Sequence, residues 1–165
     1  MDKEFQDELK YIELKKMIEK AENAVAVAVA ATAATGAVPI PFADMPLLIS
    51  EQVAMMATIC GIFHINLEKD GLKALVTAVI GAGGAGILGK TIATNLIKMI
   101  PIGGSVVGGA VSAGTAGVIT LAMGTAFIEV CKLCKMGKLG EDEILSSKGV
   151  NMMKESFRKN LKKEK

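Results

Sequence analysis

Between Gly71 and Ile128 the sequence contains no acidic residue, and its only charged side chains are three lysines. This stretch consists of two apolar, Gly/Ala-rich segments separated by Pro101-Ile-Gly-Gly. In both segments every fourth residue is small, and positions four apart lie on one ridge of an α-helix. The small residues are Thr77, Gly81, Ala85, Gly89 and Ala93 in the first segment, and Gly104, Gly108, Ser112, Ala116, Thr120 and Gly124 in the second. Each segment therefore predicts a helix with a nearly bare stripe.

Two bare stripes let helix backbones approach closely, as small residues do in pairs of membrane helices. We therefore expect a central antiparallel helical hairpin over residues 72–130. In this hairpin Gly81, Ala85 and Gly89 face the small residues of the second segment. The candidate helix-packing residues are Gly81, Ala85, Gly89, Gly104, Gly108 and Ser112.

The N-terminal region predicts one long charged helix over residues 3–35. Its first half is amphipathic, with Leu9, Ile12, Met17 and Ile18 as candidate apolar contacts. Its second half is almost entirely Ala and Val. The alternating valines there also fit a strand, but the alanines between them favour a helix.

Gly36 and two prolines end this first helix. A mostly apolar helix is expected over residues 45–63, and after the hairpin a linker at 136–140 leads to a C-terminal amphipathic helix over residues 141–161. That last helix is acidic at its start and basic at its end, as the helix dipole prefers. About five helices and no convincing strand predict an all-α fold in a single domain, residues 1–165.

The formal net charge of +2 conceals a gradient along the chain. The first 22 residues carry a net charge of −2, the central part is neutral, and residues 129–165 carry +4. With one Tyr, five Phe and no Trp, the chain lacks the aromatic belts of a polytopic membrane protein. Three cysteines do not make a disulfide framework, and the acidic start does not resemble a secretory signal. These features predict a location in the cytoplasm or at the cytoplasmic face of a membrane.

Several sequence motifs resemble a known family. They are Thr35-Gly-Ala-Val-Pro-Ile-Pro-Phe-Ala-Asp44, Glu51-Gln52-Val-Ala-Met-Met, Ile62-Phe63, Gly89-Lys90 and Ile100-Pro-Ile-Gly-Gly-Ser-Val-Val-Gly-Gly109. Together they resemble the bacterial GTPase-associated domain of unknown function found in YcjF-type inner-membrane proteins and after Era-like GTPase domains. The resemblance covers about residues 20 to 130. It implies a helical module that regulates a GTPase domain or couples it to the inner membrane, although this chain lacks that GTPase domain.

One stretch matches the P-loop pattern letter for letter, through Gly84, Gly89, Lys90 and Thr91. A working P-loop needs a downstream carboxylate for magnesium, and the segment without acids offers none. The stripe of small residues also runs straight through the match. We therefore interpret these four residues as part of a helix, and we expect neither a nucleotide-binding site nor any other cofactor site.

Two further patterns resemble binding sites. Gly81-Ala-Gly-Gly-Ala-Gly86 fits the dinucleotide fingerprint, but the acid expected about 20 residues later is absent. Cys131-Lys-Leu-Cys134 has zinc or redox spacing, and Cys60 with His64 could complete a metal site from another helix. Cysteines in an apolar helix more often serve packing. We expect no metal site and no catalytic residues, and hence no enzyme.

Three functions remain in order of preference. The first is a non-catalytic helical module, associated with membrane, that regulates or localises a GTPase present in trans or in a longer parent chain. The second is a self-associating Gly-zipper membrane protein unrelated to GTPases, and the third is a P-loop nucleotide-binding protein. Residues 99–128 are uncharged for 30 positions and 74–89 for only 16, so membrane insertion and a soluble bundle both stay open. Membrane lipid and a second copy of the chain are candidate partners, and nucleic acid is not.

Overall fold

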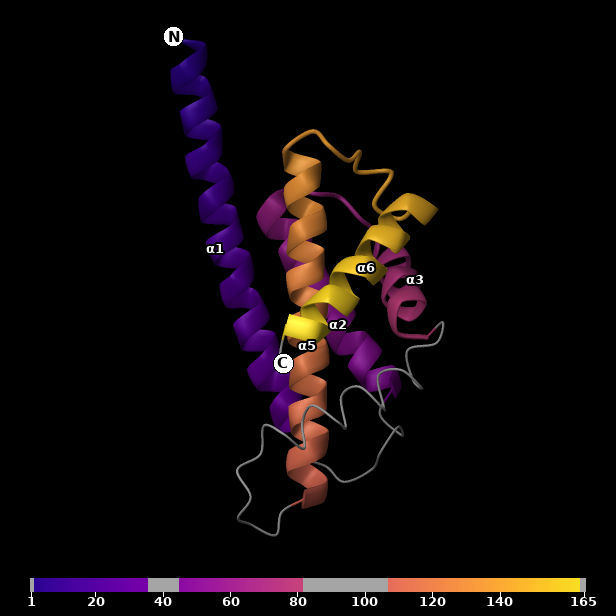
Figure 1. Cartoon of the computed structure of the whole chain (residues 1–165). Helices are drawn as coiled ribbons and strands as arrows, with labels where there is room; N and C mark the ends of the chain where they lie inside the picture. Colours follow the sequence, from indigo (N-terminus) through magenta and orange to yellow (C-terminus); the bar gives the residue numbers. More distant parts are fainter. Residues whose placement is uncertain (1, 36–44, 82–106, 164–165) are drawn as a thin grey trace.

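The fold comes from a computed structural model of the whole chain, which describes residues 2–35, 45–81 and 107–163 (Figure 1). The described helices are α1 (Lys3–Thr35), α2 (Met45–Phe63), α3 (Lys69–Gly81), α5 (Val107–Lys135) and α6 (Ser147–Lys163). These ranges contain no strand, which confirms the predicted all-α fold. The first two helices have the predicted bounds. Helix α3 begins three residues before the predicted position 72, and α5 continues five residues past 130.

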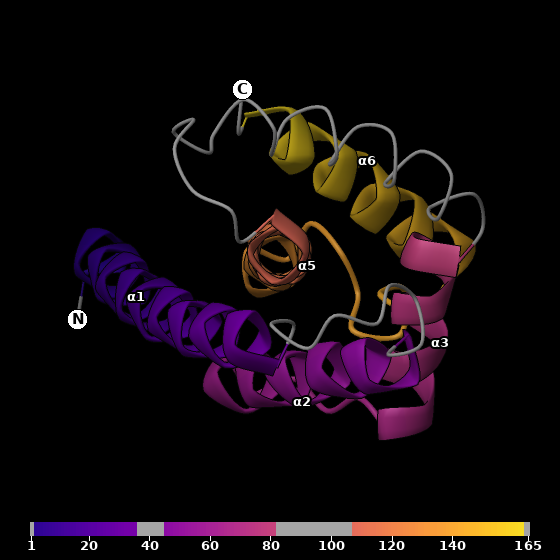
Figure 2. The ribbon, with the colours of Figure 1, turned by 90° about the horizontal axis from the view of Figure 1, so that it is seen from below.

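Helix α5 lies at the centre of the bundle, with α1, α2 and α6 around it (Figure 2). Helix α3 packs against α2 and α6 at the edge of the bundle. The described part of the predicted hairpin therefore has other neighbours as well: α3 lies on α2, and α5 is covered by α1, α2 and α6. The chain that would complete the first arm, residues 82–106, lies outside the described residues.

The core is formed mainly by large side chains from α2, α3 and α5. The largest fully buried apolar side chains are Phe63, Phe127, Met56, Ile59, Leu72, Leu75, Ile80, Met123, Ile144 and Met153. Each apolar side chain of this size contributes about 1.5–3 kcal/mol when it is fully buried. The two methionines of α2 and α5 in this list fill the bundle interior, as expected of adaptable side chains.

The contact between α1 and α5 is built from small side chains. Ala21 and Val25 of α1 are buried. A Cβ atom built on Gly124 of α5 would lie 2.5 and 2.8 Å from the two γ carbons of Val25, and 3.1 Å from Sδ of Met55. Seven residues earlier, a Cβ on Gly117 would lie 3.6 Å from Cγ1 of Val29. The C-terminal, described end of the small-residue stripe on α5 therefore packs against α1 and α2.

The predicted helix-packing residues lie elsewhere on the stripe. Gly81 is the last residue of α3, and Gly108 and Ser112 belong to the first turns of α5, but their contacts lie outside what the structure describes. Ala85, Gly89 and Gly104 lie outside the described residues altogether. The facing of the two stripes thus stays a prediction.

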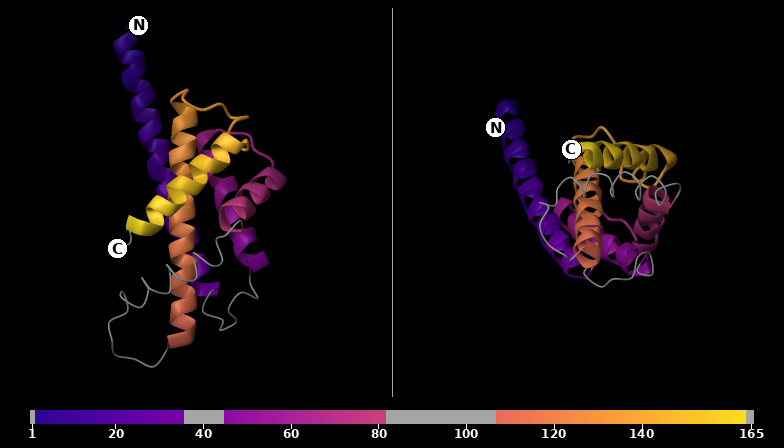
Figure 3. Two further views of the ribbon diagram at one scale, coloured as in Figure 1. Left: turned by 45° about the vertical axis from the view of Figure 1, so that its right-hand side comes forward. Right: turned by 60° about the horizontal axis from the view of Figure 1, so that its bottom comes forward.

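The first half of α1 projects away from the bundle, as Figures 1 and 3 show. Met17 and Ile18 pack against the core, as predicted. The prediction is wrong for Leu9 and Ile12, which are each 44% exposed. The physical reason is orientation: Leu9 and Ile12 share one face of α1, whereas Leu14, only two residues after Ile12, points about 200° away from it and packs against the core.

The last helix begins later than predicted. Residues 141–146 form successive tight turns, with N–H groups of Glu143, Ile144 and Ser146 donating to carbonyls three residues earlier, and α6 starts at Ser147. Ser146 is the N-cap, because its Oγ accepts from the N–H of Gly149 and its carbonyl accepts from Val150. The predicted start at 141 is therefore wrong: the acidic residues belong to the linker, and a serine ends it.

Candidate functional site

The sequence singles out residues of a P-loop pattern, and all four lie outside the described residues: Gly84, Gly89, Lys90 and Thr91. The prediction that they bind no nucleotide therefore stays a prediction. Other groups of polar or reactive side chains lie among the described residues. They are the cysteines at the ends of α2 and α5, the linker before α6, a polar bridge between α5 and α6, and a buried amide in the core.

The C-terminal ends of α2 and α5 come together, and they end in the same way. At the end of α2, the N–H of Ile65 donates to the carbonyl of Cys60 at 2.9 Å, and His64 has a φ of 51°. At the end of α5, the N–H of Lys138 donates to Leu133 at 2.9 Å, and Gly137 has a φ of 69°. Both are Schellman caps with a residue in the left-handed conformation.

Lys135 joins the two helix ends, because its Nζ donates to the carbonyl oxygen of His64 at 3.5 Å. A cation is favourable here, since both helix dipoles place negative charge at this end. A histidine can adopt the left-handed conformation, but glycine does so without strain. His64 therefore closes α2.

The three cysteines share this end of the bundle as free thiols. Burial raises the pKa of Cys60 to about 11, with a smaller contribution from the carboxylate of Glu141. Burial also raises the pKa of Cys131 strongly, followed by the nearby thiols of Cys60 and Cys134. The pKa of Cys134 is raised mainly by burial as well. Protonated thiols are poor nucleophiles and poor metal ligands.

No group of three or more Cys, His, Asp or Glu side chains in the described part of the chain is arranged to hold a metal ion. The spacing of Cys131 and Cys134 places the two thiols differently: the first is buried and the second is half-buried. The two cysteines therefore pack within the bundle as part of α5, and the described residues around them form no recognisable set of metal ligands.

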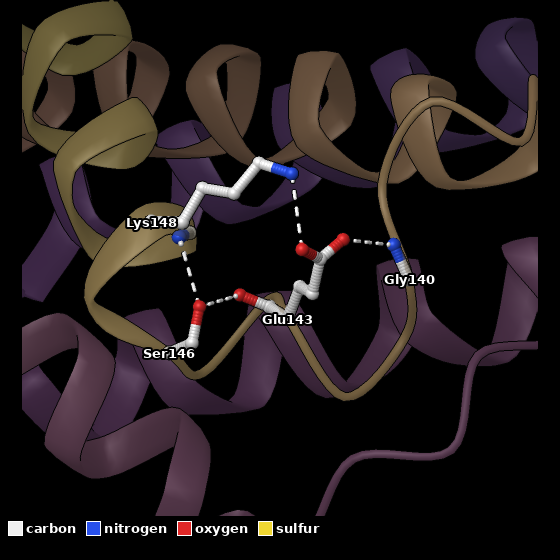
Figure 4. A network of polar contacts seen from close by, with 5 residues as sticks. Gly140, Glu143, Ser146 and Lys148 are labelled. Atoms are coloured by element: carbon white, nitrogen blue, oxygen red, sulfur yellow. Dashed lines mark hydrogen bonds and ion pairs between the residues drawn. The ribbon is translucent and has the colours of Figure 1, made fainter.

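The linker between α5 and α6 is held by the network in Figure 4. The carboxylate of Glu143 accepts from the backbone N–H of Gly140 at 2.8 Å and from Nζ of Lys148 at 3.0 Å. Oγ of Ser146 donates to the carbonyl of Glu143 at 2.6 Å. These bonds lower the pKa of Glu143, the Gly140 N–H first and Lys148 second. The network thus holds the loop between α5 and α6 in shape.

A second polar group joins α5 to α6. Oγ of Ser156 donates to the carboxylate of Glu129, and Nδ2 of Asn160 donates to the carbonyl of Ser156 at 2.9 Å. Asn160 also donates to Oγ of Ser156 at 3.3 Å. The serine hydroxyl is thus engaged as donor and acceptor, which is typical of a structural bridge between helices.

The most deeply buried polar side chains are Gln52 of α2 and Thr120 of α5, both fully buried. Nε2 of Gln52 donates to Oγ1 of Thr120 at 2.8 Å, and that hydroxyl donates to the carbonyl of Ala116 at 2.9 Å. Oε1 of Gln52 is buried without a hydrogen-bond partner in the structure as described. This pair was not predicted from the sequence, although an amide within an apolar helix is a recognisable signal.

Two described helices are long and apolar enough to cross a membrane, Pro46–Phe63 in α2 and Ala116–Lys135 in α5. The segment in α5 is 61% buried, as expected of a core helix, whereas the segment in α2 is only 33% buried. Apart from Pro46 in the first turn, the exposed residues of α2 follow helical spacing on one face, which we call the outer face of α2. Its residues are Leu47, Ser50, Ala54, Thr58 and Gly61.

Comparison with protein-family models matches residues 2–152 to one family, described as Domain of unknown function (DUF697). The comparisons with curated proteins and with solved structures give no match.

Proposed function

The chain belongs to the DUF697 family, and we propose that it is a non-catalytic, membrane-associated helical module that regulates or localises a GTPase from the cytoplasmic face. Two kinds of support lead to this function. The motifs at residues 35–63 and 100–109 resemble the GTPase-associated domains named above. The described residues, in addition, hold polar groups that are engaged in holding helices and loops.

The observation that carries the proposal is the outer face of α2. The outward face of a helix in a soluble bundle is usually charged. Here the exposed residues are Pro, Leu, Ser, Ala, Thr and Gly, and the only charged residue in all of α2 is Glu51, which is half-buried. Oγ1 of Thr58 donates to the carbonyl of Ala54 at 3.0 Å, so this hydroxyl is satisfied within the helix. Such a face suits an apolar surface or a close-packed helix.

Membrane association and GTPase regulation are tested in separate experiments. The tagged full chain is fractionated into membrane pellet and supernatant, before and after a carbonate wash. We expect the chain in the pellet and its release by carbonate, because α5 is committed to the core. Ala54→Arg places a charge on the outer face and should move the chain to the supernatant. Ala30→Arg, which changes another exposed alanine, on α1, is the matched control and should not move the chain.

The GTPase arm uses chemical crosslinking of the tagged chain in cells, followed by purification and assay of the GTPase that is captured. We expect the purified chain to change the nucleotide affinity or GTP hydrolysis rate of that GTPase by at least about fivefold, the usual lower range of coupling between sites. A wild-type chain found only in the supernatant contradicts the membrane role. Capture of no GTPase contradicts the regulatory role.

A further inference from the structure

The projecting half of α1 carries an apolar stripe that nothing in the described structure covers. Phe5, Leu9 and Ile12 are 49%, 44% and 44% exposed. They belong neither to the core nor to the half-buried side chains packed against it, whereas Leu14 and Ile18 pack there. We call Phe5, Leu9 and Ile12 the α1 stripe.

The α1 stripe lies on the opposite side of the helix from the face that meets the bundle. Its members are four and three residues apart, which places them on one face. Ile12 and Leu14 are two residues apart, so their side chains point about 200° from each other around the helix axis. The stripe continues, at the same spacing, to Lys16 and Glu19. The exposed apolar surface is thus about two helical turns long, and charged residues follow it at its C-terminal end.

Charges along the projecting half are sorted by sign. Residues 2–8 contain four acids and one lysine, a net charge of −3, and residues 10–20 contain four lysines and two glutamates, a net charge of +2. Among the residues that the structure describes, the one salt bridge joins Lys148 to Glu143, far along the chain. The charges of α1 therefore have no ion-pair partner within 4.0 Å in this part of the molecule.

We propose that the α1 stripe pairs antiparallel with the same stripe of a second copy of this chain. In this arrangement Leu9 of each copy packs against Ile12 of the other. The acidic start of each helix then lies beside the basic segment of its partner, and the helix dipoles run in opposite directions. Both effects are favourable.

The flanking charges select the antiparallel orientation. When Phe5, Leu9 and Ile12 form the seam of a coiled coil, Glu8 and Lys15 occupy equivalent flanking positions one heptad apart. Antiparallel pairing brings Glu8 of each copy next to Lys15 of the other, which gives two attractive pairs. Parallel pairing instead brings Glu8 next to Glu13 and Lys15 next to Lys20, which are all like-charge contacts. At the seam, Lys16 of one copy lies beside the ring of Phe5 of the other, a favourable cation–aromatic contact.

The interface is short, so the association is weak. It covers about two heptads, at the low end of the sizes found for specific interfaces. We expect dissociation constants between about 10 μM and 1 mM in solution. Attachment to a membrane or to a partner would raise the local concentration and favour the pair.

The test is sedimentation equilibrium of the full chain over a range of concentrations at low salt. We expect the average mass to rise towards twice that of one chain. Glu8→Lys alone and Lys15→Glu alone should each leave the chain monomeric, and mixing the two variants should restore pairing between them. Both positions are exposed, so circular dichroism and the thermal midpoint should not change.

The same variants report the orientation. If the pair were parallel, Glu8→Lys would face Glu13 of the partner and would tighten the association, which overturns the antiparallel proposal. A combined Phe5→Gln, Leu9→Gln and Ile12→Gln variant should also be monomeric. A wild-type chain that stays monomeric up to about 1 mM overturns the proposal. If that monomer binds anionic phospholipid vesicles and the combined variant does not, the stripe contacts lipid instead.

Discussion

The two halves of α1 form one continuous helix, but different physical effects define them. The half from Ala21 to Thr32 packs against α5 and α2, and its buried residues are small. In the half from Lys3 to Lys20 most side chains are exposed, and its first turns project from the bundle, while Leu14, Met17 and Ile18 pack against the core. In the packed half, shape decides what a residue contributes to stability. In the projecting half, charge and exposed apolar area decide what a residue could bind. The stability of the fold depends little on the exposed residues of this half.

This difference predicts where substitutions should act. The packed half leaves no space for added atoms at its closest point, between Val25 and Gly124. The projecting half should accept most changes within about 0.5 kcal/mol, as exposed positions generally do.

Gly124→Leu should break the packed half. The first added carbon already lies 2.5 Å from Cγ2 of Val25, a β-branched residue with little freedom about χ1. Overpacking of this kind costs about 3 kcal/mol, which in a chain of this size lowers the thermal midpoint by about 6–12 °C. Calorimetry or thermal circular dichroism gives the result.

A double substitution is the control for Gly124. Gly124→Ala alone should destabilise, and Val25→Ala in the same chain should relieve the clash, so the two effects should not add. Additive losses would mean that the two residues are not in contact and that α1 does not pack on α5 at this point.

Thr120→Val should remove the buried hydrogen bond between α5 and α2. The substitution keeps the volume but leaves Nε2 of Gln52 buried without a partner, as Oε1 already is. An unsatisfied buried group costs about 1–3 kcal/mol. Gln52→Met removes both unsatisfied atoms at similar volume, so it should cost less than Thr120→Val or even stabilise. Urea unfolding of the two variants compares them directly, and the reverse order would contradict the described pair.

Gly117→Ala should stabilise the chain slightly. A Cβ here meets Cγ1 of Val29 at 3.6 Å, which is an ordinary contact. Alanine in a helix interior is favoured over glycine by about 0.5–1 kcal/mol. The same substitution therefore has opposite signs at two glycines two turns apart on α5. If Gly117→Ala destabilises as much as Gly124→Ala, the helices lie closer at Gly117 than the structure has them.

Much of the fold could be predicted from the sequence because its signals are local. Gly36 and the following prolines mark the end of α1, and the run of alanines favours a helix over a strand. The predicted start of α6 was wrong because two sequence signals compete in this region. The acids after Gly140 suit a helix start, but Ser146 provides the cap that the backbone uses.

Partners in space were harder to predict than helices. A stripe of small residues predicts close packing but not the identity of the neighbour. Thr120 and Gly124 lie on the predicted stripe, yet they face Gln52, Val25 and Met55. Leu9 and Ile12 have the spacing of a buried face, but periodicity does not reveal on which side of α1 the bundle lies. Contacts far apart in sequence depend on where every helix ends.

The contact between Val25 and Gly124 also bears on how the chain is made. Its two residues are 99 positions apart in the sequence, so the packed face of α1 leaves the ribosome well before its partner. At about 5–20 residues per second, roughly 5–20 s pass before α5 is synthesised. Contacts of such long range also slow folding. A helix face of alanine and valine exposes less apolar area than one of leucine and phenylalanine. This composition lowers the tendency of α1 to aggregate before α5 has been synthesised.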